Sequence, residues 1–274
     1  MKRFFPDAFS LKGKTAIVTG GAGILGKHFC AGLASAGAQV VVVDLDERKC
    51  ESLARDLASD YGVDTMGMGC DVSSSVSVRA MVRKVVRRFR RIDVLHNNAA
   101  SKSSDLNAFF ASYEEYSLKE WRKVMAVNLD GMFLVAQAAG SVMAKQAGGG
   151  TIIQTASIYG WVAPDQSIYK GSFYLGREIN TPAVYAVSKA GVIGLTRYLA
   201  AYWAKKGVRV NTLIPGGVES GQNATFKKKY SARVPLGRMA KAEEMVGALI
   251  YLASDASSYV TGQNIIVDGG LSAW

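Results

Sequence analysis

Short apolar runs rich in β-branched residues alternate with helical patterns along the whole chain, and this alternation narrows the possible folds more than any other feature. Strands are predicted at 15–19, 39–43, a segment ending near Cys70, 92–95, 151–154, 208–213 and 264–267. Helices are predicted at 25–36, from Glu47, through the basic segment 79–91, and at 118–145, 183–206 and 242–254. Parallel strands joined by helical crossovers form a doubly wound sheet. We therefore predict a single α/β domain over residues 1–274, with seven parallel strands and helices on both faces.

Two segments, 101–117 and 161–181, are too long to be simple connections. They follow the fourth and fifth predicted strands, and long loops at the carboxyl ends of parallel strands commonly carry function. We expect both insertions to overhang a substrate pocket, with an oligomer contact as the alternative for 161–181.

Composition excludes several classes of protein. Apolar residues make up 49% and charged residues 20% of the 274 positions, which is typical of a globular domain. No continuous apolar run approaches the roughly 18 residues of a membrane span, and Pro6 and Asp7 cut the N-terminal apolar stretch too short for a signal peptide. Cys30, Cys50 and Cys70 form no C-x-x-C pair, so we expect reduced thiols, no metal site and a cytoplasmic protein.

The formal net charge of +11 comes largely from the basic segment 79–91 and from three consecutive lysines at 227–229. Val82, Val85 and Phe89 recur in the basic segment at helical spacing, so its basic residues are expected to form the solvated face of an amphipathic helix. A nucleic-acid partner is the less favoured interpretation. A positive field still favours anionic ligands.

A glycine-rich turn links the first predicted strand to the first helix, with Gly21, Gly23 and Gly26 in the spacing G-x-G-x-x-G. Glycine permits the tight turn and lets backbone N–H groups approach a pyrophosphate at the helix N-terminus. A plain strand-to-helix turn is the alternative. The position after strand one favours a Rossmann-type dinucleotide site, with contacts from Gly20, Ala22, Gly23, Leu25 and Gly26.

Asp44 closes the second strand, where its carboxylate can accept hydrogen bonds from the adenosine ribose and would repel a 2′-phosphate. Leu45 follows, with no adjacent cation to bind such a phosphate, so NAD is predicted over NADP. A helix-capping acid at position 44 would carry no such preference. Asp71, after the third strand, either reaches the adenine or caps the helix near Ser73.

Tyr185 and Lys189 lie four residues apart on a predicted helix, so their side-chain directions differ by about 40° and their Cα atoms by roughly 6 Å along the axis. A free tyrosine has a pKa of about 10, so a phenolate near neutrality needs about 4 kcal/mol of stabilisation. A nearby ammonium group has the right sign to supply it. When no other motif accompanies them, a tyrosine and a lysine four residues apart more often lie on an ordinary helix surface.

With these features together, the chain resembles the short-chain dehydrogenase/reductase family over nearly its whole length. It is most similar to the dehydrogenase branch that includes gluconate and sugar dehydrogenases. The matching segments are 19–26, Asp71, 97–100, Asn128 within 127–131, Ser157, Tyr185 with Lys189, 211–216 and 267–270.

The resemblance implies roles for four catalytic residues. Tyr185 would exchange a proton with the substrate oxygen, Lys189 would hold the nicotinamide ribose, Ser157 would bind the substrate oxygen, and Asn128 would organise a water chain. It also implies a homotetramer or dimer. The implied cofactor contacts, besides the glycine turn, Tyr185 and Lys189, are Asp44, Asp71, Val72, Asn98, Ala99, Pro215, Gly216 and Val218.

Two departures from the family pattern stand out. Ile24 replaces the usual middle glycine, which has moved to Gly23 as in sugar-nucleotide epimerases. Ser157 precedes Tyr185 by more than the usual gap. It is still preferred because it ends the fifth strand, whereas Ser167 and Ser172 lie on the insertion and Thr155 should point elsewhere by strand alternation.

The insertion 161–181 mixes aromatic and charged residues, including Trp161, Tyr169 and Tyr174. Aromatic rings stack on sugar faces, and Lys170 or Arg177 could meet a carboxylate. We therefore predict an NAD(H)-dependent oxidoreductase that transfers a hydride between nicotinamide and a secondary alcohol or ketone of a polyol, sugar or sugar acid.

Two other functions remain as alternatives. An NADP-dependent 3-ketoacyl reductase is the first, although Asp44 and the long insertion after Ser157 argue against it. A non-catalytic NAD-binding sensor or scaffold is the second, and the intact catalytic residues argue against that. A sugar-nucleotide epimerase would need a longer substrate domain than this chain has.

Overall fold

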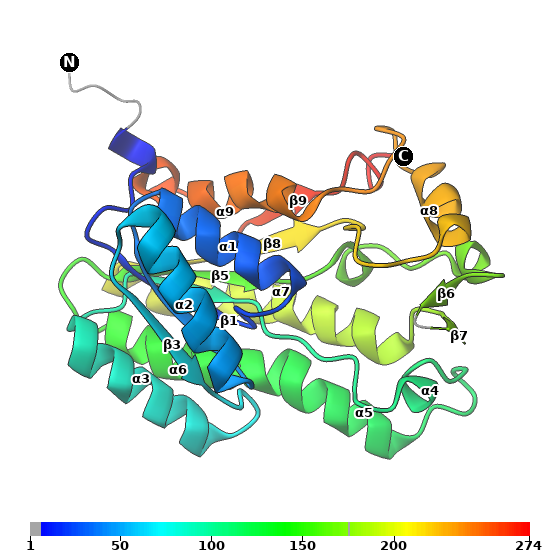
Figure 1. Cartoon of the computed structure of the whole chain (residues 1–274), viewed down its shortest axis with the longest axis horizontal. Helices are drawn as coiled ribbons and strands as arrows, with labels where there is room; N and C mark the ends of the chain where they lie inside the picture. Colours follow the sequence, from blue (N-terminus) through cyan, green and yellow to red (C-terminus); the bar gives the residue numbers. More distant parts are fainter. Residues whose placement is uncertain (1–6, 175) are drawn as a thin grey trace.

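Seven parallel strands form one sheet at the centre of the computed structural model, which describes residues 7–174 and 176–274 (Figure 1). Their order across the sheet is β3 (Thr65–Gly69), β2 (Gln39–Asp44), β1 (Thr15–Thr19), β4 (Val94–Asn97), β5 (Gly150–Thr155), β8 (Val208–Pro215) and β9 (Asn264–Val267). The predicted doubly wound fold is confirmed. Because the strand order reverses between β1 and β4, a crevice is expected at their carboxyl ends. Residues 1–6, which include most of the N-terminal stretch judged too short for a signal peptide, lie outside the described residues.

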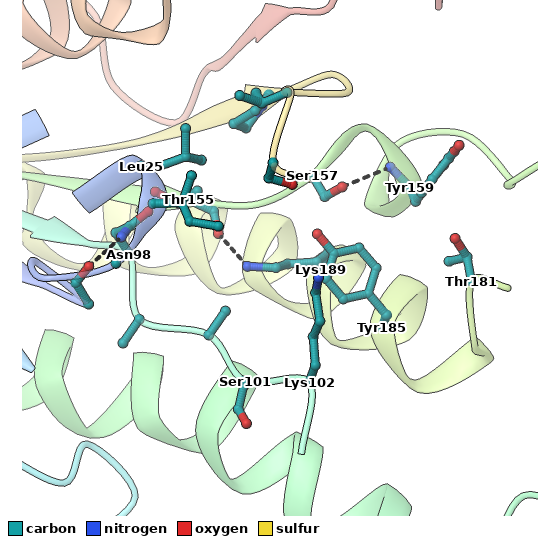
Figure 2. A pocket seen from close by; sticks show the side chains of 18 of the residues that line it. Leu25, Asn98, Ser101, Lys102, Thr155, Ser157, Tyr159, Thr181, Tyr185 and Lys189 are labelled. Atoms are coloured by element: carbon teal, nitrogen blue, oxygen red, sulfur yellow. Dashed lines mark hydrogen bonds between the residues drawn. The ribbon is translucent and has the colours of Figure 1, made fainter. Parts of the chain in front are cut away.

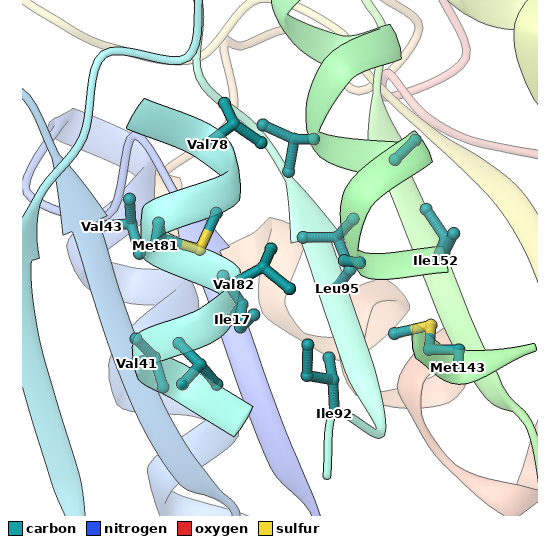
Figure 3. Close-up of a cluster of buried hydrophobic side chains, with 14 of the residues drawn as sticks. Ile17, Val41, Val43, Val78, Met81, Val82, Ile92, Leu95, Met143 and Ile152 are labelled. Carbon is teal, nitrogen blue, oxygen red and sulfur yellow. The ribbon is translucent and has the colours of Figure 1, made fainter. Parts of the chain in front are cut away.

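Helices cover both faces of the sheet. On one face lie α1 (Ile24–Ser35), α2 (Glu47–Tyr61) and α9 (Val246–Ala253), and on the other lie α3 (Ser75–Phe89), α6 (Met132–Met143) and α7 (Ala183–Trp203). Strand β1 is buried along its whole length and serves both layers, with Ile17 facing α3 while Ala16 and Val18 face α1. Figure 3 shows the packing of α3 side chains against Ile17 and Leu95 of the sheet.

The basic helix α3 is amphipathic, as its spacing predicted. Val78, Met81, Val82, Val85 and Phe89 are buried in the core under the sheet. The exposed face carries Arg79, Arg83, Lys84, Arg87 and Arg88. Much of the net charge is therefore solvated on one helix face.

The helix predicted over 118–145 is present as a continuous helix over Leu118–Met143, but a π-helical turn that was not predicted widens its middle. It consists of α5 (Leu118–Met125), a π-helical turn, η2 (Ala126–Gly131), and α6. Leu118–Met143 is long and apolar enough to cross a membrane by length and composition alone, but the buried face of α6 packs on the sheet like any core helix. The π turn carries Asn128, and such turns are frequent at functional sites.

Several short elements were not predicted, and they gather at the carboxyl end of the sheet (Figure 1). The insertion 101–117 contains α4 (Leu106–Phe109), and the insertion 161–181 contains η4 (Gln166–Tyr169) and an antiparallel hairpin of β6 (Phe173–Tyr174) and β7 (Arg177–Glu178). Helix α8 (Ala224–Ser231) follows β8 at the same end. Together these segments cover the crevice at the strand ends.

Candidate active site

A cavity of about 650 Å³ opens at the carboxyl ends of the central strands, a volume typical of small-molecule sites. It is lined by the glycine turn, the ends of β2, β4, β5 and β8, and both insertions. Two predicted site residues, Ala22 and Asn128, lie outside this lining. The other predicted residues all line it: Gly20, Gly23, Leu25, Gly26, Asp44, Asp71, Val72, Asn98, Ala99, Ser157, Tyr185, Lys189, Pro215, Gly216 and Val218.

The glycine turn requires glycine at two positions in particular. Gly20 has φ of +64°, and a Cβ there would lie 2.9 Å from the Ala99 Cα atom. A Cβ on Gly26 would lie 2.0 Å from the Gly20 carbonyl oxygen, so the turn could not keep this shape with a larger residue. Gly23 caps α1 without a side-chain hydrogen bond, which leaves the N-terminus of the helix facing the cavity. Ile24 sits half-exposed on the cavity rim and is compatible with the turn.

Asp44 lies at the end of β2 with its carboxylate fixed by the backbone. Its Oδ2 accepts a hydrogen bond from the Ala22 N–H at 3.1 Å, and its Oδ1 accepts one from the Leu45 N–H at 2.8 Å. Ala22 thus contacts Asp44 instead of lining the cavity. These contacts hold a negative charge beside the glycine turn, where the adenosine half of a dinucleotide would lie.

Asp71 lines the same end of the cavity, but it does not cap the following helix. Ser74 is the N-cap of α3, and its side chain accepts from the Ser77 N–H. The Asp71 carboxylate instead accepts from the backbone and hydroxyl of Ser73, at 2.9 and 2.6 Å. The capping alternative for Asp71 is therefore wrong.

Lys189 projects from α7 toward the end of β5, where its Nζ donates a hydrogen bond to the Thr155 carbonyl at 2.9 Å (Figure 2). Its side chain is 2% exposed, and burial lowers the pKa of Lys189 to about 8. The same ammonium group lies 6.0 Å from the centroid of the Tyr185 ring. Burial raises the pKa of Tyr185, and a hydrogen bond with the Ser157 side chain opposes that rise. A phenol, a hydroxyl and a desolvated ammonium therefore meet at one end of the cavity.

Ser157 is the serine that the fold places beside Tyr185. It follows β5 and lines the cavity, and its Oγ accepts from the Tyr159 N–H at 3.3 Å (Figure 2). The Thr155 hydroxyl turns away to His96, with 2.8 Å between Oγ1 and Nε2, as expected. Strand alternation is not the reason, because residues two apart share a face of a strand. Ser172 is fully buried with its hydroxyl donating to the Ile168 carbonyl, and Ser167 does not line the cavity.

Asn128 lies behind the cavity, fully buried in the π turn η2. Its Oδ1 accepts from the Ser101 N–H at 2.8 Å, whereas its Nδ2 has no hydrogen-bond partner within the described part of the chain. Buried polar groups without a protein partner are commonly satisfied by ordered water. The Asn128 amide group is therefore available to hold a water.

The cations predicted for the substrate end of the cavity, Lys170 and Arg177, are not the ones found there. Trp161, Lys170 and Arg177 do not line the cavity, and the Arg177 guanidinium instead donates to the Asn107 side chain. Among the described residues, Lys189 and Lys102 are the cations of the lining, and Lys102, which lies on the other insertion, was not predicted. Aromatic residues form much of the surrounding wall: Phe110, Tyr159, Tyr169, Tyr174, Phe226 and Tyr230.

Known proteins resemble this chain over nearly its whole length. Residues 20–272 match the family model described as "Enoyl-(Acyl carrier protein) reductase". A D-threitol dehydrogenase of Mycolicibacterium smegmatis is 38% identical over 96% of this chain and 94% of its own length. A 3-oxoacyl-(acyl-carrier-protein) reductase of Aquifex aeolicus is 32% identical over 95% and 98%.

Solved structures of similar sequence share this fold. A gluconate 5-dehydrogenase of Burkholderia cenocepacia, solved with NADP and tartrate, superposes with a TM-score of 0.86 and is 35% identical, with 98% of each chain covered. The family model and these relatives span nearly the whole chain, and the glycine turn, Ser157, Tyr185 and Lys189 line one cavity. The chain belongs to the short-chain dehydrogenase/reductase family of oxidoreductases, which bind a nicotinamide cofactor.

Proposed function

We propose that this protein is an NAD(H)-dependent dehydrogenase that acts on a secondary alcohol of a polyol, sugar or sugar acid. The observation that carries the proposal is the single cavity that joins the glycine turn and Asp44 at one end to Ser157, Tyr185 and Lys189 at the other. Similarity to a D-threitol dehydrogenase and a gluconate 5-dehydrogenase supports the substrate class. Tyrosines, amides and hydroxyls along the wall offer the stacking surfaces and hydrogen bonds that a polyol needs.

The residues present fit a nicotinamide dinucleotide. The two glycines without room for a Cβ and the open N-terminus of α1 suit a pyrophosphate, and Asp44 suits ribose hydroxyls. When bound, the cofactor supplies a carbon that accepts or returns a hydride. We propose that Val218, Pro215 and Gly216 line its nicotinamide end.

The remaining chemistry is proton transfer by this chain's own groups. During alcohol oxidation the Tyr185 oxygen takes the hydroxyl proton, and Ser157 donates a hydrogen bond to the substrate oxygen. The Lys189 ammonium stabilises the phenolate form of Tyr185 by its charge. A water held by the free amide group of Asn128 would then carry the proton away from the site.

The substrate class is tested with purified protein, both oxidised cofactors and a panel of alditols and aldonates. The reverse reaction is assayed with ketoses, keto acids and a ketoacyl thioester. We expect the highest kcat/KM for a polyol, sugar or sugar acid with NAD(H). A preference for the ketoacyl thioester with NADPH would contradict the proposal and favour the ketoacyl reductase function of the Aquifex relative.

Asp44 is proposed to set the preference for NAD. Replacing it, Asp44→Ala, removes a charge that would repel the 2′-phosphate of NADP. The ratio of kcat/KM with NADP⁺ to that with NAD⁺ should therefore rise roughly 10- to 100-fold. Steady-state kinetics with both cofactors measures this ratio.

Asp46→Ala is the matched control for this prediction. Asp46 caps α2, with its side chain accepting from the Lys49 N–H, and it does not line the cavity. Its loss should weaken the N-terminus of α2 and leave the cofactor ratio unchanged. An unchanged ratio in Asp44→Ala, or a wild type that prefers NADP⁺, would contradict the proposed role of Asp44.

A further inference from the structure

Lys102 enters the substrate end of the cavity from the loop that follows β4 (Figure 2). Lys102 counts as an exposed residue, because the cavity is open to solvent. Its ammonium group nevertheless lies 4.2 Å from the centroid of the Tyr174 ring. Desolvation of this end lowers the pKa of Lys102. No carboxylate in the described ranges forms an ion pair with Lys102, so its closest charge-related contact is a cation–π interaction.

The charges along the cavity are distributed unevenly. Both carboxylates of the lining, Asp44 and Asp71, lie beside the glycine turn at the adenosine end. The insertion residues around Lys102 contribute aromatic rings, amides and hydroxyls, including Tyr174, Asn180 and Thr181. The second cation of the lining, Lys189, already donates to the Thr155 carbonyl. Of the described residues, Lys102 is therefore the cation best placed to bind a negative charge on a substrate.

The position of Lys102 is fixed from two sides. Its neighbour Ser101 donates its backbone N–H to the Asn128 Oδ1 at 2.8 Å, which ties the loop to the proposed catalytic centre. On the other side the two insertions bind one another, because the Asn180 Nδ2 donates to the Phe110 carbonyl at 2.7 Å. The Lys102–Tyr174 contact spans the same junction. These contacts hold the ammonium group at the junction of the two insertions, in the same cavity as Tyr185.

We infer that Lys102 is a specificity-determining residue that binds the carboxylate of a sugar acid whose secondary alcohol lies at Tyr185. The inference rests on the proposed dehydrogenase function and narrows its substrate class from polyols in general to aldonates. A charge-assisted hydrogen bond to a carboxylate is about twice as strong as one to a neutral hydroxyl. A neutral polyol of the same length would leave the ammonium with only its aromatic contact.

The test uses pairs of substrates that differ only at one end. D-Gluconate and D-glucitol are one such pair, and the corresponding four- and five-carbon acids and alditols are the others. The wild type should have a higher kcat/KM for the acid in at least one pair. In Lys102→Met the ratio of kcat/KM for that acid over its alditol should fall roughly 10- to 100-fold, mainly through KM for the acid. Lys102→Arg should keep most of the ratio, because it keeps the positive charge.

Lys170→Met is the matched control, since Lys170 lies on the other insertion and outside the cavity lining. It should leave the ratio unchanged. A wild type that shows no preference for any acid, or a Lys102→Met variant with an unchanged ratio, would overturn the inference. Oxidation of alditols without that preference would overturn the role of Lys102 alone. Turnover of neither class would contradict the proposed function and the inference together.

Binding provides a readout that does not depend on turnover. In a Tyr185→Phe background with NAD⁺ present, the preferred acid should raise Tm, and the added Lys102→Met change should remove that rise. An equal rise in both proteins would contradict carboxylate binding by Lys102.

Discussion

Tyr185→Phe should lower kcat for alcohol oxidation by about 10²- to 10⁴-fold, because it removes the oxygen that takes the substrate proton. The change deletes one hydroxyl from a half-buried ring on α7 and leaves the glycine turn intact. Cofactor affinity should therefore change little. Initial rates of NADH formation measure the loss, and a fluorescence titration with NADH checks that the cofactor still binds.

Tyr113→Phe is the matched control for this prediction. Tyr113 is 78% exposed on the insertion 101–117 and does not line the cavity. Its variant should keep the wild-type rate. A Tyr185→Phe enzyme that turns over as fast as the wild type would show that another group moves the proton.

Lys189→Met should have two opposite effects, because it should abolish most of the activity and stabilise the protein without cofactor. Burial lowers the pKa of Lys189 from 10.5 to about 8, so between these pH values the unfolded chain binds more protons than the folded one. Stability contributed by this group therefore rises as pH increases from about 8 to 10.5. At pH 7 the buried ammonium destabilises the fold by up to about 3 kcal/mol.

The methionine variant removes this charge, so at pH 7 its free energy of unfolding should exceed that of the wild type. Loss of the hydrogen bond to the Thr155 carbonyl offsets about 1 kcal/mol of the gain. The difference should shrink as pH rises toward 10. Urea unfolding of both proteins at pH 7 and pH 10 measures it, and a variant that is less stable at both pH values would contradict the account.

Much of the sheet could be predicted because each central strand carries its signal in a few adjacent residues. The run of four valines at 40–43 in β2 is buried on both sides, which is the pattern of an inner parallel strand. Tyr185 and Lys189 were also predictable, because helical spacing alone brings two residues four apart to one face. In these cases local sequence determines the local structure.

The π turn and the insertions could not be predicted in the same way. Hydrophobic periodicity continues through 118–145, so nothing in the spacing shows that the helix widens around Asn128. The hairpin in 161–181 has strands of only two residues, Phe173–Tyr174 and Arg177–Glu178, which is too short for any alternation to appear.

Lys102 was missed for a different reason. It stands among serines in a polar loop, as an ordinary surface lysine would, and its place in the cavity depends on a contact with Tyr174 from the other insertion. Lys170 and Arg177 had the right chemistry but lie outside the lining. Contacts between two irregular segments are set by the tertiary fold, which single-sequence patterns do not encode.

The most direct test of the proposed function follows the transferred hydrogen itself. The polyol or sugar acid with the highest kcat/KM is prepared with deuterium on the secondary carbon that becomes the carbonyl, and it is oxidised with NAD⁺. Mass spectrometry of the reduced cofactor then shows where the deuterium has gone. Direct transfer between that carbon and nicotinamide predicts NADH that carries the deuterium. Unlabelled NADH, with the deuterium lost to water or retained in the product, would contradict it.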